Sequence, residues 1–185
     1  VRLLADAVRQ GYSVIATEPA AVLCLKHEYP NLLDDEDAHL VADHAFEACE
    51  FLWHLHEGDR LALDFEPINA SIAYHQPCHL RVLDPKQSGP SLMSLIPELS
   101  VEPIEAGCTG MAGTWGLQKK NYRNSLRIGW PLISAMRSAR VSIATTECSA
   151  CKMQIEHGSG RKTLHPLKLL AYAYGRMPKV EKELG

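Results

Sequence analysis

Short apolar runs alternate along the chain with longer amphipathic segments, and this alternation predicts an α/β fold. Each run is bounded by polar, glycine or proline residues, as expected for a strand that lies inside a sheet. Strands are expected at residues 14–17, 72–74, 101–105 and 141–145. We therefore expect parallel sheets with helices packed on their faces.

The most regular helical pattern covers residues 35–56, where apolar side chains recur at spacings of three and four and Gly58 follows as a stop. The amino-terminal residues are also amphipathic, so the chain is expected to be a piece of a longer polypeptide. Further helices are predicted at residues 19–29, 91–96, 120–137 with an interruption before Pro131, after Cys148, and at 166–174.

Residues 15–22 and 144–151 resemble each other at a constant offset of 129, and each copy combines a strand with a following helix. Both copies contain Thr-Glu, so Glu18 and Glu147 are each expected to cap the helix that follows. The repeat predicts two related half-domains, residues 1–70 and 71–185. In the first copy Pro19 and Val22 replace Cys148 and Cys151, so the first half is expected to supply no cysteine ligands.

Composition excludes several classes of protein. The net charge is −3, and the chain is expected to lack the clustered Lys and Arg that follow a phosphate backbone, so nucleic-acid binding is not expected. The sequence contains neither a membrane-spanning apolar run nor a signal-peptide pattern. Six unevenly spaced cysteines are too few for a disulfide scaffold of this size and indicate a reducing compartment, hence the cytoplasm.

Four of the six cysteines lie in short segments that follow predicted strands: Cys78, Cys108, Cys148 and Cys151. Because parallel strands end at one edge of a sheet, these loops can converge there. Four thiolates from three loops fit an iron–sulfur cluster or a tetrahedral zinc ion. Cys24 and Cys49 instead lie on apolar helical faces and are expected to be buried and inert.

Other interpretations of the same residues stay open. The pair Cys148 and Cys151 forms a C-x-x-C, which could act alone as a redox dithiol. The glycines around Cys108 permit close approach of the backbone but lack the order of a nucleotide-binding loop. Residues that could tune a bound cluster without being main ligands are His75, His79, Thr109, Gly110 and His165.

Three separated motifs resemble those of the cysteine-rich CCG domain family: Pro77-Cys78-His79, the segment 107–116 (GCTGMAGTWG) and Glu147-Cys148-Ser149-Ala150-Cys151. Proteins of this family include iron–sulfur subunits of anaerobic glycerol-3-phosphate dehydrogenase, of glycolate and lactate oxidation, and of heterodisulfide reductase. The resemblance covers nearly the whole chain, which is similar above all to the carboxyl-terminal part of FAD-linked iron–sulfur oxidoreductases.

The resemblance implies an electron-transfer domain that receives electrons from FAD held by an absent domain or subunit. It implies that a quinone or a soluble carrier accepts them, and it allows an association with the inner face of the membrane through a partner. Where the family has paired cysteines, this chain has Cys108 followed by Thr109. The remaining four thiolates suit one [4Fe-4S] cluster, with a structural zinc or docking module as the alternative.

Overall fold

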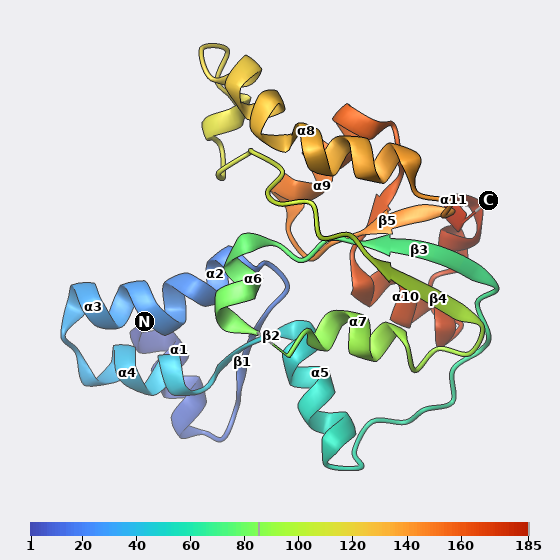
Figure 1. Cartoon of the computed structure of the whole chain (residues 1–185). Helices are drawn as coiled ribbons and strands as arrows, with labels where there is room; N and C mark the ends of the chain where they lie inside the picture. Colours follow the sequence, from blue (N-terminus) through green and yellow to red (C-terminus); the bar gives the residue numbers. More distant parts are fainter. Residues whose placement is uncertain (85, 185) are drawn as a thin grey trace.

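The computed structural model describes residues 1–84 and 86–184 and contains two parallel sheets with helices on their faces (Figure 1). In the smaller sheet β1 (Val14–Ala16) pairs with β2 (Ala45–Glu47). The larger sheet has the order β4-β3-β5-β6. Its strands are β3 (Ala70–Tyr74), β4 (Leu99–Pro103), β5 (Ile143–Thr145) and β6 (Thr163–Leu164). The predicted α/β class with parallel sheets in two half-domains is confirmed.

Helices surround both sheets. Around the smaller sheet lie α1 (Arg2–Arg9), α2 (Pro19–Leu23), the π-helical turn η1 (Cys24–Glu28), α3 (Tyr29–Leu33) and α4 (Glu36–Asp43), and α5 (Ala48–Glu57) follows β2. The larger sheet is accompanied by α6 (Cys78–Leu83), α7 (Ser88–Met93), η2 (Trp115–Leu117), α8 (Tyr122–Ser138), α9 (Ser149–Ser159), α10 (Pro166–Ala173), η3 (Pro178–Val180) and α11 (Glu181–Leu184).

The larger sheet is covered on both faces, because alternate residues of its strands point in opposite directions. Ile72 and Ile143 belong to a core that includes residues of α5, α7 and α10. Ala73 and Ala144 point to the other side and pack with Ile155 of α9 and with residues of α8. In Figure 1, α8 and α9 accordingly lie above the sheet, while α7 and α10 lie below it.

The single helix predicted at residues 35–56 is wrong. The structure divides this segment into α4, the strand β2 and α5. Glu47 ends the strand and begins the next helix, because its carboxylate accepts hydrogen bonds from the backbone N–H groups of Cys49 (2.7 Å) and Glu50 (3.3 Å). Apolar residues recur at spacings of three and four through α4, β2 and α5 because all three elements bury small apolar side chains. The sequence therefore has the periodicity of one long helix although the structure has a strand in the middle.

Other element boundaries also differ from the prediction. β4 begins and ends two residues earlier than expected, and β6 was not predicted, since two residues carry no detectable periodicity. α8 continues through Pro131, so the predicted interruption is wrong. Pro131 is exposed, and so is Arg127, whose carbonyl has no N–H donor at position 131. Cys24 is only half-buried, contrary to expectation, whereas Cys49 is fully buried.

Helix α8 holds the loop that follows β4, because two glycines allow their backbones to touch. A side-chain carbon on Gly129 would lie 2.1 Å from the carbonyl oxygen of Thr109. One on Gly110, whose φ is +84°, would lie 2.2 Å from the carbonyl oxygen of Ser125. The loop bearing Cys108 and Thr109 is thus fixed against the helix at these two positions.

No helix among residues 1–84 and 86–184 is long and apolar enough to cross a membrane.

We expect Gly129→Ala to lower the free energy of unfolding by about 1–3 kcal/mol, because the added methyl group overlaps the Thr109 carbonyl. The loss should occur although alanine normally favours a helix over glycine by about 1 kcal/mol. Asn124→Ala, at an exposed position of the same helix, should change stability by less than about 0.5 kcal/mol. Urea unfolding of both variants checks this, and equal stabilities would contradict it.

Candidate metal centre

Three strands of the larger sheet end at the same level, and each leads into a loop that bears cysteine. Tyr74 of β3 pairs with both Pro103 of β4 and Thr145 of β5. Cys78 begins α6 after β3, Cys108 follows β4, and Cys148 with Cys151 lies at the start of α9 after β5. The structure therefore brings all four predicted cysteines to one edge of the sheet.

The thiols are close enough to influence one another. Partial burial of the thiol raises the pKa of Cys78, and the neighbouring Cys108 and Cys148 raise it further. Cys148 and Cys151 are buried, whereas Cys78 and Cys108 are exposed. Of the four candidate ligands, two thus lie inside the protein and two are open to solvent.

Two hydrogen bonds to sulfur come from the glycine-rich loop. The Gly110 N–H donates to Sγ of Cys108 at 3.3 Å, and the Thr109 hydroxyl donates to Sγ of Cys151 at 3.4 Å. Thr109 is only 2% exposed, so its side chain points into the site. Thr109 and Gly110, both named from the sequence as residues that could tune the site, therefore contact the cysteine sulfurs.

The C-x-x-C pair is in direct contact. The Cys151 thiol donates a hydrogen bond to the Cys148 sulfur, which lowers the pKa of Cys148 although burial opposes the shift. The same hydrogen bond, together with burial, raises the pKa of Cys151. Cys148 is also the N-cap residue of α9, where a thiolate is stabilised by the end of the helix.

The donor set bears on which group the site could hold. Four thiolates are a ligand set for either tetrahedral zinc or a [4Fe-4S] cluster. Within residues 1–84 and 86–184, no three side chains of His, Cys, Asp or Glu are placed to hold one metal ion. A cluster distributes its thiolates over several iron atoms, and hydrogen bonds to its sulfurs tune its potential. The bonds from Thr109 and Gly110 suit thiolates that bind either group.

Two buried polar atoms beside the cysteine loops lack hydrogen-bond partners among the described residues: Nδ1 of His75 and Oγ1 of Thr146. His75 precedes Cys78 by three residues, and burial followed by the charge of Arg81 lowers its pKa to about 4. Such a pair of orphaned groups is expected where a bound group completes the site. His79, by contrast, is half-exposed.

His165 and Glu18 join the two halves beside Cys148. Nδ1 of His165 accepts from the Leu167 N–H at 3.1 Å, so the proton lies on Nε2, which donates to the Thr17 carbonyl at 3.0 Å. The Glu18 carboxylate accepts from the Ser149 N–H at 3.0 Å. Glu18 therefore caps α9 across the interface, and the prediction that it caps its own helix is wrong.

Glu147 also has a different partner from the one predicted. Its carboxylate accepts from the Tyr74 hydroxyl at 3.1 and 3.2 Å. Glu147 is only 1% exposed, and burial raises its pKa well above the usual range. It therefore anchors the segment before Cys148 to the end of β3, rather than capping α9.

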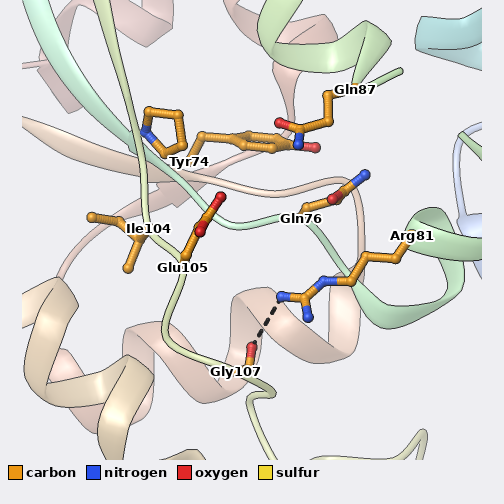
Figure 2. A pocket seen from close by; sticks show the side chains of 8 residues that line it. Tyr74, Gln76, Arg81, Gln87, Ile104, Glu105 and Gly107 are labelled. Atoms are coloured by element: carbon orange, nitrogen blue, oxygen red, sulfur yellow. Dashed lines mark hydrogen bonds between the residues drawn. The ribbon is translucent and has the colours of Figure 1, made fainter. Parts of the chain in front are cut away.

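A cavity of about 300 Å³ lies beside the loops of Cys78 and Cys108 (Figure 2). Its walls include Tyr74, Gln76 and Glu105, and Arg81 reaches across it to donate to the Gly107 carbonyl at 3.4 Å. Arg81 thus ties α6 to the loop before Cys108. Sequence reasoning missed Arg81, although its position one helical turn after Cys78 could have suggested a role near the site.

Comparison with known proteins agrees with this geometry. Residues 72–156 match the model of a cysteine-rich domain named CCG. The chain is 35% identical over 165 residues to a subunit of the anaerobic glycerol-3-phosphate dehydrogenase of Escherichia coli, an alignment of 89% of this chain with 41% of that protein. The chain thus spans less than half the length of that relative.

Two further similarities are more distant. D-2-hydroxyglutarate dehydrogenase of Escherichia coli is 26% identical over 168 residues, covering 86% of this chain and 15% of the enzyme. An uncharacterized iron–sulfur protein of Methanocaldococcus jannaschii is 33% identical over 94 residues, covering 50% of this chain and 19% of that protein.

We expect the contact made by His165 to weaken in acid. Burial lowers the pKa of this histidine in the folded protein, so below about pH 6.5 the unfolded chain binds more protons and stability falls. His165→Gln, which does not titrate, should show a shallower decline between pH 7.5 and 5, by up to about 1.4 kcal/mol per pH unit. Urea unfolding across this range measures both slopes, and identical slopes would contradict the expectation.

Proposed function

We propose that this chain, whose residues 72–156 form a cysteine-rich domain of the CCG family, is an iron–sulfur electron-transfer domain of a flavin-linked dehydrogenase. The observation that carries the proposal is the convergence of four thiols from three loops at one edge of a parallel sheet. The names of the relatives support it, since they include an iron–sulfur protein and two dehydrogenases.

Cys78, Cys108, Cys148 and Cys151 would hold a [4Fe-4S] cluster, which when bound supplies a one-electron carrier. The chain's own residues then have distinct tasks. Thr109 and Gly110 direct hydrogen bonds at the sulfurs, and the buried side of the site excludes water from Cys148 and Cys151. The exposed side, with Cys78 and Cys108, is open to an electron donor or acceptor.

FAD would belong to a domain or subunit outside this sequence, and a quinone or soluble carrier would accept the electrons. By analogy with the relatives, the substrate of the whole enzyme would be glycerol 3-phosphate or a 2-hydroxy acid. We place the enzyme in the cytoplasm, where thiolates stay reduced, and a partner could attach it to the inner face of the membrane.

We expect the protein purified without oxygen to contain about four iron and about four sulfide per chain, the composition of one [4Fe-4S] cluster. Cys148→Ser should lose most of this iron, because it removes one thiolate from the set. Cys24→Ser, which changes a half-buried cysteine outside the site, should retain it. Iron and sulfide analysis with visible spectroscopy checks these results. Folded protein that stays iron-free after reconstitution, or that binds zinc instead, would refute the proposal.

We expect Thr109→Val to lower the reduction potential of the cluster, because it removes a hydrogen bond to the Cys151 sulfur that stabilises the more negative, reduced state. A hydrogen bond of about 0.5–1.5 kcal/mol corresponds to roughly 20–60 mV for one electron. Thr114→Val, in the exposed part of the same loop, should leave the potential unchanged. Redox titration followed by electron paramagnetic resonance measures the shift, and equal potentials would show that Thr109 does not act on the cluster.

One observation favours a second function, a dithiol oxidoreductase. Cys148 has a lowered pKa at the start of a helix and a buried partner thiol in contact, as a thiol–disulfide exchange pair requires. Such activity would survive replacement of both Cys78 and Cys108 by serine, whereas the cluster would not. The double variant therefore separates the two functions.

A further inference from the structure

Positive charge is concentrated in one continuous segment of this acidic chain. Residues 106–146 contain six Lys and Arg and no Asp or Glu. The rest of the chain holds the other 13 Lys and Arg together with all 22 Asp and Glu, a net charge of −9. The expectation that the chain lacks clustered basic residues is therefore wrong for this segment, and the overall charge of −3 conceals the separation.

Lys119 and Lys120 lie on the loop before α8, three arginines lie on that helix, and Arg140 follows it. In Figure 1, α8 is at the outer side of the molecule. All are exposed, and none belongs to an ion pair found within residues 1–84 and 86–184. They are Lys119, Lys120, Arg123, Arg127, Arg137 and Arg140. Because no carboxylate of the described chain neutralises them, these charges are available to an anionic ligand outside it.

Large apolar side chains are exposed among these charges. Leu117 is 58% exposed, Ile128 50% and Trp130 55%. Trp115 and Ile128, together with Cys108, line an apolar hollow of about 380 Å³. We call this hollow, together with the four basic residues on the loop before α8 and on its first half (Lys119, Lys120, Arg123 and Arg127), the basic face. An apolar centre with a charged rim is the usual composition of a protein–protein interface.

We propose that the basic face docks the carboxylate-rich surface of a protein redox partner, so that electrons cross beside Cys108. This inference rests on the proposed function and adds to it the place and the charge of the partner. Cys108 is the proposed ligand that is both exposed and part of the hollow, so a side chain seated there would approach the cluster closely. Opposite charges speed such an encounter without requiring a large interface.

The arrangement fits a protein better than a lipid surface or a nucleic acid. A helix that lies in a bilayer presents a continuous apolar stripe to the lipid. The exposed side of α8 instead interleaves Arg123 and Arg127 with Ile128 and Trp130, and the adjoining apolar area is concave. A phosphate backbone would leave the apolar centre unmatched.

The test uses this chain with its cluster reconstituted, and an acidic flavodoxin-type FMN protein as the probe. Each encounter moves one electron from the reduced FMN of the probe to the cluster, so the flavin is oxidised and the cluster reduced by one electron each. The second-order rate should fall as salt is raised. Arg123→Glu/Arg127→Glu should lower it at least about tenfold at low salt and remove most of the salt dependence.

A matched control makes the same change in charge elsewhere. Arg60→Glu/Arg176→Glu alters two exposed arginines that follow α5 and α10, the helices on the opposite face of the sheet from α8. This variant should keep the rate within about twofold of the unaltered chain. The docking proposal would be overturned if both double variants lowered the second-order rate equally. It would also be overturned if the rate changed neither with salt nor in Arg123→Glu/Arg127→Glu.

A second readout does not depend on the cluster. Carbodiimide coupling of the cluster-free chain to the probe, mapped by mass spectrometry, should join Lys119 or Lys120 to carboxylates of the probe. Such links in protein that never binds iron would uphold docking while refuting the electron-transfer function. The chain is also tested on vesicles of phosphatidylglycerol and phosphatidylcholine. If these vesicles bind the chain, Arg123→Glu/Arg127→Glu abolishes the binding, and the rate of electron transfer from the probe is unchanged in that variant, the basic face binds lipid and the docking proposal is overturned.

Discussion

The parallel register of β3, β4 and β5 is the constraint on which the site depends. Because Tyr74 pairs with both Pro103 and Thr145, the three strands finish together and their loops leave the sheet at one edge. A slip of one residue would turn every side chain of a strand to the other face and displace its loop. The two apolar cores, one on each face of the sheet, oppose such a slip.

The amino-terminal half contributes to the site although it lacks the cysteines of the second copy. Glu18 and Thr17 belong to the first copy of the repeat, and both bind backbone or side-chain groups beside Cys148. Glu147, the counterpart of Glu18, is buried against Tyr74. The two glutamates that the predicted repeat aligns thus have different partners, and Glu18 holds the helix that contains Cys151.

The candidate site has a buried side and an exposed side. On its inner side are buried thiols and buried polar atoms without hydrogen-bond partners, while Cys108 on its outer side lines an apolar hollow next to the arginines of α8. The glycine-rich loop contacts both sides of the site. Its Thr109 hydroxyl donates a hydrogen bond to the Cys151 sulfur, and the Thr109 carbonyl packs against Gly129 of α8, the helix that carries the arginines. The proposed tuning of the site and the proposed contact with a partner would therefore share one structural element.

The sequence alone determined the fold class, the parallel strands that precede each cysteine, and the separation of the four loop cysteines from Cys49. These features are local: apolar periodicity predicts strands and helices, and parallel strands bring their ends together. The resemblance of three cysteine motifs to the CCG family could likewise be read from the chain, and the match at residues 72–156 agrees with it.

Only the tertiary structure decided the partners of individual side chains. Residues 35–56 have helical spacing, yet Glu47 and pairing with β1 make a strand in the middle. Glu18 caps a helix 131 residues away because the two halves meet there, a contact that no local pattern encodes. The concentration of basic residues could be read from the sequence of residues 106–146, but the apolar hollow formed by Cys108, Trp115 and Ile128 could not. Local preference is set by neighbours in the chain, whereas these contacts are set by packing between distant segments.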